Sequence, residues 1–237
     1  IAMWSIGNET TQGCYVGVAP DRAAALLKEL QTVAKAEDPS RVTTLAANRD
    51  QDKTSGITDI WAQNQYFMWY TNEPAANLGT LLDLWHTNQP KQPQGVSEYG
   101  AGAAISHHSD NLTGSMGSVY TFDMSGKSRT MYQPEEYASY VHEQVYAEMA
   151  KREYIWGTYV WNMFDFGSGI RHEGDIGATN TKGLVTFDRK TKKDPFYFYK
   201  AQWSKDPVAY IAGRRYIDRN YPTAGVKVYS NTDSVTL

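Results

Sequence analysis

Two glutamates of this chain stand at or just beyond the ends of short runs that read as strands. Glu9 comes three residues after the apolar run 1–6, and Glu98 ends the run Gln-Gly-Val-Ser-Glu at 94–98. If both runs are parallel strands, their carboxyl ends lie at the edge of the sheet where α/β folds bind ligands. Two carboxylates about 5 to 5.5 Å apart form the catalytic pair of a retaining glycosidase. The alternatives at this point are structural ion pairs, or helix capping by Asn8 or Glu9.

The neighbours of the two glutamates favour different roles for them. Asn8 precedes Glu9 and has an amide that can hydrogen-bond a sugar hydroxyl beside the bond to be cleaved. Tyr99 follows Glu98, and Tyr66 follows another predicted strand. A phenol hydroxyl that donates to the Glu98 carboxylate would orient it and favour its ionised form.

Strand-like and helix-like patterns alternate along most of the chain. The helical stretch 21–38 has Leu26, Leu30 and Val33 on one face, which predicts that this face is buried. Five strand–helix units in succession predict a parallel sheet. A complete (β/α)₈ TIM barrel needs about 250 residues, so the units are interpreted as its second part, strands 4 to 8. The predicted strands are 1–6, 41–46, 58–63, 94–98 and 156–161, and the predicted helices are 21–38, 76–88, one from Pro134 onward, and 194–203.

The pattern changes near the C-terminal end. Residues 208–214 and 225–230 alternate with period two, which is typical of antiparallel strands. We therefore expect 1–204 to be the C-terminal part of a barrel domain and 205–237 to begin an immunoglobulin-like sandwich. The missing barrel strands suggest a piece of a longer protein, which we expect to have little activity without its N-terminal part.

Composition excludes some classes of function. The 237 residues carry a formal net charge of -3, which argues against a nucleic-acid partner. No apolar run reaches the 18 residues of a membrane span. Aromatic residues make up 13% of the chain and often adjoin polar residues, an arrangement that suits a sugar ligand as well as core packing. Cys14 is alone and decides neither cytoplasm nor exterior.

Three motifs resemble those of glycoside hydrolase family 2: Trp-Ser-Ile-Gly-Asn-Glu at 4–9, Ser-Glu-Tyr-Gly at 97–100 and Val-Trp-Asn-Met-Phe-Asp-Phe at 160–166. Their order and spacing match strands four, seven and eight of that family's barrel. The resemblance implies that Glu9 is the acid/base and Glu98 the nucleophile. It also implies that Asn8 contacts the 2-hydroxyl, that Tyr66 hydrogen-bonds the nucleophile, and that Trp161 forms part of the sugar platform.

The substrate has two candidates within this resemblance. Asn180 and Lys182 resemble the carboxylate-binding element of β-glucuronidases, and an ammonium is a good partner for a uronate. Residues 182–201 are similar to bacterial β-galactosidases, and the predicted sandwich strands after the barrel are typical of that branch. We therefore expect hydrolysis of terminal β-D-galactosides or related oligosaccharides, with β-glucuronides as the alternative.

Other functions stay open at this stage. The resemblance implies Mg²⁺ or Na⁺, but no complete ligand set can be assigned, and adjacent His107 and His108 are a weak metal signal. A noncatalytic carbohydrate-binding or assembly fragment is a further alternative, because a half-barrel has open sheet edges that invite association, including with copies of itself.

Overall fold

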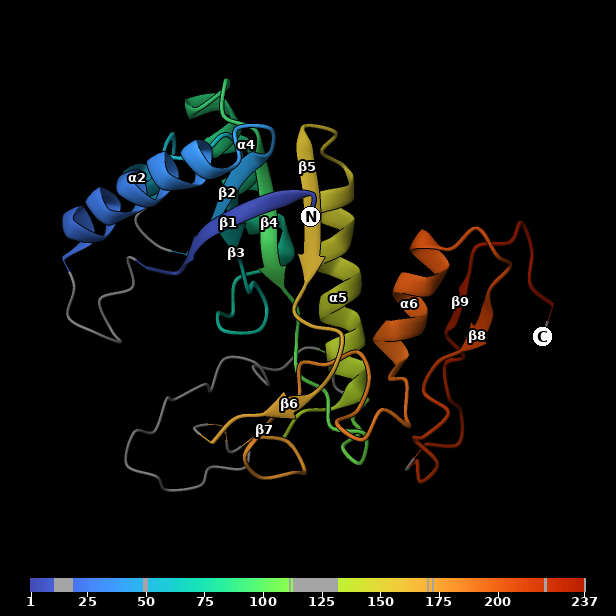
Figure 1. The fold of residues 1–237 in the computed structure, drawn as a ribbon. Coiled ribbons are helices and arrows are strands. Elements are labelled where there is room, and N and C mark those ends of the chain that lie inside the picture. Colours follow the sequence, from blue (N-terminus) through green and yellow to red (C-terminus); the bar gives the residue numbers. More distant parts are fainter. Residues whose placement is uncertain are drawn as a thin grey trace. The chain divides into compact units, whose positions relative to one another are not determined.

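The computed structural model describes residues 1–10, 19–48, 51–110, 112, 132–169, 171, 173–219 and 221–236, without the side chains of 51 and 52 (Figure 1). Cys14 lies outside these residues, and so do residues 113–131. The chain forms two compact units. Unit 1 contains residues 1–66, 76–99 and 147–160, and unit 2 contains 67–75, 100–146 and 161–237. No helix among the described residues is long and apolar enough to cross a membrane.

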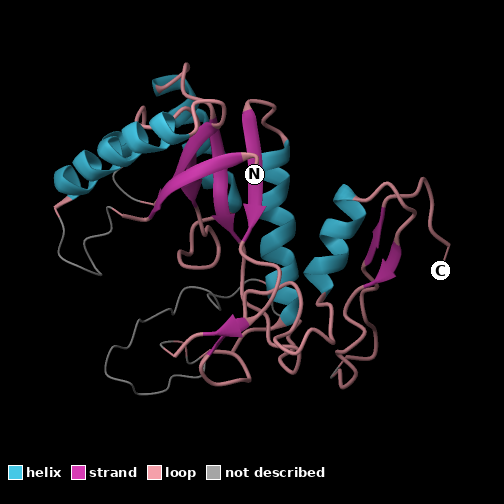
Figure 2. Cartoon of the chain, viewed as in Figure 1, coloured by secondary structure: helices cyan, strands magenta, loops and turns pink. Residues whose placement is uncertain are grey.

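Unit 1 is built on a five-stranded parallel sheet in the order β1-β2-β3-β4-β5, which confirms the predicted parallel α/β architecture (Figure 2). The numbering of these strands as 4 to 8 of a barrel stays a prediction. The strands are β1 Met3–Asn8, β2 Val42–Ala47, β3 Trp61–Asn64, β4 Gln94–Tyr99 and β5 Ile155–Val160. Along the chain the strands alternate with the helices α2 Pro20–Glu37, α3 Gln51–Thr54, α4 Ala75–Asn88 and α5 Glu135–Ala150, and most of α5 belongs to unit 2.

The register brings the carboxyl ends of the strands together at one edge. Asn8 pairs with Ala46, and Asn64 pairs with Glu98. The pairing shifts just before each of these positions, between Ser5 and Asn8 and between Gln63 and Asn64. Such irregularities re-aim side chains at the rim of a sheet. Glu9 and Glu98 therefore lie at the same edge, as parallel pairing requires.

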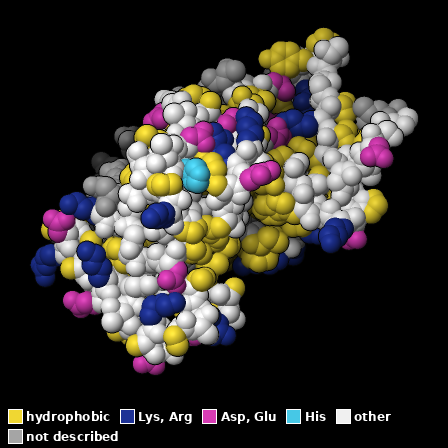
Figure 3. Space-filling model, turned by 90° about the horizontal axis from the view of Figure 1, so that it is seen from above, with side chains coloured by type: hydrophobic (Ala, Val, Ile, Leu, Met, Phe, Trp, Pro, Cys, Tyr) yellow, Lys and Arg dark blue, Asp and Glu magenta, His cyan; other side chains and the backbone are white. Residues whose placement is uncertain are grey.

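The prediction that α2 buries the face with Leu26, Leu30 and Val33 is wrong. Leu26 and Val33 are 55% and 57% exposed, and Leu30 is exposed as well. The buried residues are Ala23, Ala24 and Leu27. The reason lies on β1, where a Cβ added at Gly7 would come within 2.7 Å of Leu27 Cδ2. The glycine lets the Leu27 side chain pack directly on the strand. Figure 3 shows hydrophobic side chains among the charged ones on one face of the molecule.

The first strand is less buried than its apolar sequence predicts. Every residue of β1 is exposed or half-buried, and Trp4 is 38% exposed. Within the described residues β1 pairs only with β2, so it is an edge strand with one hydrogen-bonded neighbour. The Trp4 indole donates to Asp38 at 3.0 Å. The core of the sheet lies instead around Leu27, Leu45 and Trp61.

Unit 2 contains short antiparallel pairs and one further helix. β6 Phe166–Gly167 pairs with β7 Thr179–Asn180, and β8 Ala209–Ile211 pairs with β9 Val228–Ser230. The helix α6 spans Asp194–Trp203, the range predicted from the sequence. Tyr197 stacks on Tyr210 with ring centroids 3.6 Å apart, which attaches β8 to α6. The boundary between residues 204 and 205 stays a prediction.

Candidate active site

Glu9 has an unusual backbone conformation immediately after β1. Its φ is +50°, in the left-handed region that non-glycine residues seldom adopt, and its backbone N–H donates to the Ala46 carbonyl at 2.8 Å. The side-chain Oε1 accepts hydrogen bonds from Asn48 Nδ2 at 3.1 Å and Asn64 Nδ2 at 2.8 Å. Backbone strain of this kind persists where the surroundings hold it, often at functional sites. The carboxyl group is thus fixed by the amide of Asn48, which follows β2, and by the amide of Asn64 at the end of β3.

Asn64 is the centre of this arrangement. Its side chain is buried, and Nδ2 donates to Asn8 Oδ1 at 3.0 Å as well as to Glu9. Its Oδ1 accepts from Ser97 Oγ at 2.7 Å. One amide on β3 therefore connects the Asn8–Glu9 tip of β1 to β4.

Glu98 lies beside Asn64 on the next strand and is half-buried. The Tyr66 hydroxyl donates to Glu98 Oε2 at 2.7 Å, and the Gln65 N–H donates to the Glu98 carbonyl at 2.8 Å. A phenol that donates to a carboxylate restricts the orientation of that carboxylate. Asn64 contacts Glu9 through its side chain and Glu98 through strand pairing, so both glutamates adjoin one residue.

The other predicted site residues belong to unit 2. Trp161 follows β5 and is 37% exposed, with its ring edge-to-face against Phe166 at 5.9 Å. Asn180 lies in β7, where its Oδ1 accepts from the Lys182 N–H at 3.1 Å. The structure therefore gathers Asn8, Glu9, Tyr66 and Glu98 within unit 1, and Trp161, Asn180 and Lys182 within unit 2. The roles of all seven residues stay predictions.

Lys182 is fully buried against aromatic rings. Its side chain has 1% exposure, and Nζ lies 4.9 Å from the Tyr70 ring centroid and 5.5 Å from that of Trp69. An ammonium over an aromatic face is attracted by the ring quadrupole. An anionic group placed beside this cation would stabilise it further, since burying a charge is costly.

A buried ion pair holds the backbone on both sides of Lys182. Lys193 Nζ donates to the Thr181 carbonyl at 2.9 Å and to Asp165 Oδ1 at 2.8 Å, and the same Oδ1 accepts from the Gly183 N–H at 2.9 Å. Burial lowers the pKa of Lys193, and the adjacent Asp165 carboxylate opposes that shift. A Cβ at Gly183 would come within 2.0 Å of the Asp165 nitrogen, so only glycine fits here.

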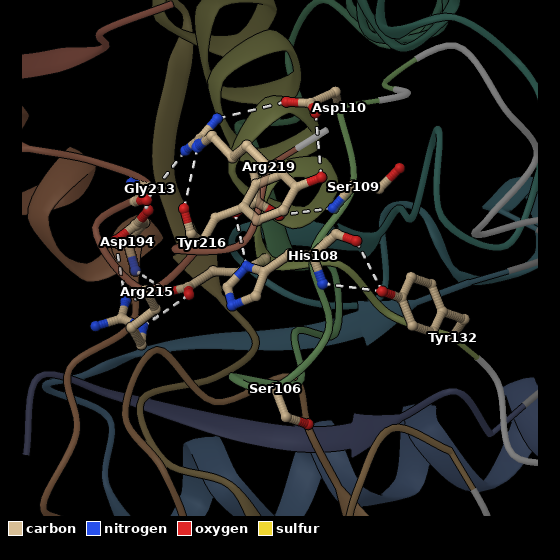
Figure 4. Close-up of polar contacts among 12 residues, drawn as sticks. Ser106, His108, Ser109, Asp110, Tyr132, Asp194, Gly213, Arg215, Tyr216 and Arg219 are labelled. Carbon is tan, nitrogen blue, oxygen red and sulfur yellow. Dashed lines mark hydrogen bonds and ion pairs between the residues drawn. The ribbon is translucent and has the colours of Figure 1, made fainter. Parts of the chain in front are cut away.

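His107 and His108 belong to a cluster of side chains that contact one another. Part of this cluster is drawn in Figure 4. His108 Nδ1 lies 2.8 Å from Glu136 Oε1, and the His108 ring stacks on Tyr216. Asp110 accepts from the Tyr216 hydroxyl at 3.1 Å and pairs with Arg219 at 3.4 Å. Within the described ranges, no group of three or more His, Cys, Asp or Glu side chains has the arrangement of a metal site.

Figure 4 also shows Arg215 next to Asp194 in unit 2. Arg215 Nη2 lies 3.0 Å from Asp194 Oδ1, and the Asp194 side chain is buried. Glu135, at the start of α5, accepts from the Asp194 N–H at 2.6 Å and pairs with the same arginine. Burial raises the pKa of Glu135, and the Arg215 guanidinium opposes that shift. These contacts join the N-terminal ends of α5 and α6 to the segment after β8.

Sequence reasoning missed three side chains around the glutamates, namely Asn48, Asn64 and Ser97. Each is polar and lies at or near the carboxyl end of a strand, which is a usable signal in a parallel sheet. Polar residues at strand ends are also common in ordinary loops. Only the register shows which of them reach Glu9.

Comparisons with known proteins agree with this architecture. The family model for "Glycosyl hydrolases family 2, TIM barrel domain" matches residues 1–206. A β-glucuronidase of Bacteroides fragilis is 43% identical over 91% of this chain and 28% of its own length. The chain thus spans less than a third of that relative.

Solved structures show the same similarity. An FMN-binding β-glucuronidase of Faecalibacterium prausnitzii has a TM-score of 0.83 and 38% identity, covering 98% of this chain and 33% of its own. A Bacteroides fragilis protein provisionally described as a β-galactosidase has a TM-score of 0.82 and 34% identity, covering 99% of this chain and 32% of its own. From the matched residues and the parallel sheet that they form, the chain belongs to glycosyl hydrolase family 2, and residues 1–206 are TIM barrel domain sequence of that family.

Proposed function

We propose that the protein carrying this chain is a retaining β-glucuronidase, with Glu98 as nucleophile and Glu9 as general acid/base. Membership of a glycosyl hydrolase family supports the reaction class. The relative that is 43% identical is named a β-glucuronidase, and so is the solved structure with 38% identity. These names favour the alternative expectation over the galactoside one.

In the proposed reaction, Glu98 attacks the anomeric carbon while Glu9 donates a proton to the leaving oxygen. The Tyr66 hydroxyl donates a hydrogen bond to the attacking Glu98 carboxylate at 2.7 Å and so restricts the orientation of that carboxylate. Asn48 and Asn64 hold the Glu9 carboxyl group through Oε1. Water deprotonated by Glu9 then releases the sugar with retained configuration.

The single observation that carries the substrate class is the environment of Lys182. Its ammonium is buried against Trp69 and Tyr70, and Asn180 accepts from its backbone N–H. A uronate differs from a neutral hexose by a carboxylate, which such a site would bind by charge and hydrogen bonding. We propose that Lys182 and Asn180 receive this carboxylate, that Asn8 contacts the 2-hydroxyl, and that Trp161 contributes a flat apolar face to the sugar.

The galactoside expectation depended on the strands that follow the barrel. That feature does not discriminate, because a solved structure named a β-glucuronidase covers 98% of this chain, well beyond residue 206. The pair β8 and β9 is therefore compatible with either substrate. The proposed contact of Lys182 with the substrate is the better criterion, since an ammonium distinguishes a carboxylate from a hydroxymethyl group chemically.

The test is hydrolysis of aryl β-glucuronides and aryl β-galactosides by the protein expressed from its complete gene. We expect glucuronide turnover in large excess over galactoside turnover. Glu98→Gln should abolish it, and Glu9→Gln should reduce it about 10²- to 10⁴-fold, less for good leaving groups because protonation then matters less. The exposed Glu29→Gln on α2 is the matched control. Turnover of galactosides alone would overturn the substrate proposal, and equal losses on all leaving groups would overturn the role of Glu9.

A further inference from the structure

Arg171 connects the aromatic neighbour of Lys182 to a buried carboxylate. Its Nη1 lies 3.2 Å from the Tyr70 hydroxyl oxygen and 3.1 Å from Glu173 Oε1. The Glu173 side chain is 3% exposed and that of Arg171 is 15% exposed. A guanidinium has several donors in a fixed planar geometry, so it can hold two acceptors in a defined relation. Arg171 thereby fixes the Tyr70 hydroxyl relative to Glu173.

The same carboxylate is linked to the segment after β7 that carries Lys182. Glu173 Oε2 accepts from Gln133 Nε2 at 2.9 Å, and Gln133 Oε1 accepts from the Thr181 hydroxyl. Thr181 directly precedes Lys182 in the chain. Gln133 and Thr181 are both at least 98% buried. A continuous series of hydrogen bonds therefore runs from Tyr70 to the residue beside Lys182.

Close packing keeps this series in place. A Cβ added at Gly102 would come within 3.0 Å of both Gln133 Oε1 and Thr181 Oγ1, and one at Gly174 would come within 3.0 Å of Thr181 Cγ2. The backbone on both sides thus approaches the Gln133–Thr181 contact with no room for a side chain. The two ends of the series meet again in space, because Lys182 Nζ lies 4.9 Å from the Tyr70 ring centroid.

We propose that Arg171 is a positioning residue for recognition of the substrate carboxylate: by holding Tyr70 to Glu173, it sets the Tyr70 ring and the Lys182 ammonium in the geometry that binds a uronate. This inference rests on the proposed function. The positive charge of Arg171 is balanced by Glu173, so Arg171 orients the site while Lys182 supplies the charge that meets the carboxylate. Binding of neutral sugars, which do not engage Lys182 through a charge, should not depend on Arg171.

The test uses Arg171→Met and Arg171→Lys in the protein expressed from its complete gene. For Arg171→Met we expect KM for an aryl β-glucuronide to rise roughly 10-fold, the effect of losing one charge-assisted contact, while kcat changes less than threefold. The inhibition constant of glucarolactone, which bears a carboxylate, should rise in parallel. That of neutral gluconolactone should stay constant. Arg171→Lys keeps the charge without the planar donor geometry. Its KM for the glucuronide and its inhibition constant for glucarolactone should lie between those of the wild type and of Arg171→Met.

The matched control is Lys190→Met, which removes a cation from the same unit where the side chain is 82% exposed. A KM for glucuronide within twofold of wild type in Arg171→Met would overturn the inference and leave the proposed function intact. An equal rise in the inhibition constants of the two lactones would also overturn it. A general structural defect weakens the binding of charged and neutral inhibitors alike. A wild-type protein without glucuronidase activity would overturn the proposed function itself, and this inference with it. If Arg171→Met does not fold, the comparison of wild type with Arg171→Lys makes the same distinction.

Discussion

Replacing Tyr66 by phenylalanine tests the proposed nucleophile with the removal of a single atom. The hydroxyl donates to Glu98 Oε2 at 2.7 Å, and the rest of the ring is retained. A hydrogen bond to a charged group contributes about 1.5 to 3 kcal/mol, and every 1.36 kcal/mol of barrier corresponds to about tenfold in rate. Both side chains are half-buried, so water partly compensates for the loss. We therefore expect kcat/KM to fall about 10- to 30-fold, near the lower end of the range that about 1.5 to 3 kcal/mol corresponds to.

The assay is kcat/KM on aryl β-glucuronides whose leaving groups differ in acidity. Because the lost bond lies on the nucleophile, the decrease should be similar for good and poor leaving groups, unlike the effect of Glu9→Gln. The exposed Tyr159→Phe in the same unit is the control for loss of a phenol hydroxyl. A Tyr66→Phe protein that melts at the wild-type temperature and retains kcat/KM within threefold would refute the reasoning about Glu98.

Two further predictions concern a buried amide and a buried imidazole. Asn64→Ala removes the 2.8 Å bond to Glu9 and the acceptor of Ser97, and should lower kcat/KM about 10- to 100-fold; an unchanged value would show that Glu9 does not need this amide. Burial lowers the pKa of His142 to about 4, so the folded protein keeps it neutral while the unfolded chain protonates it below about pH 6.5. Its contribution to the free energy of unfolding is full above pH 6.5 and is lost towards pH 4, by roughly 3 kcal/mol. Urea unfolding at pH 7 and pH 4 should therefore show a smaller pH dependence for His142→Gln than for wild type, and equal dependence would contradict the assignment.

The parallel arrangement of the strands could be predicted because its signals are local. Short apolar runs bounded by polar residues, separated by helical patterns, restrict each segment to one type of element. The second residue of the helix Asp194–Trp203 is a proline, which is a local signal for the start of a helix. The two glutamates at strand ends follow from the same reasoning, since parallel strands share one carboxyl edge.

Burial of α2 could not be predicted from periodicity, because the helix has two apolar stripes. Leu26 with Val33 and Ala23 with Leu27 both fit a helical period. The close approach at Gly7 selects the second stripe, and this contact joins residues that lie 20 positions apart. A local pattern contains no information about which stripe meets the sheet.

What the sequence by itself determined is therefore the class of elements, their order and the pair of carboxylates at one edge. What only the tertiary structure decided is the set of side chains that surround them. Asn64 reaches Glu9 because the register of β1, β2 and β3 brings their carboxyl ends to one edge of the sheet, and Arg171 reaches Tyr70 across 101 positions of the chain. Hydrogen bonds of this kind depend on distances of a few ångströms between remote segments, and those distances exist only after the chain has packed.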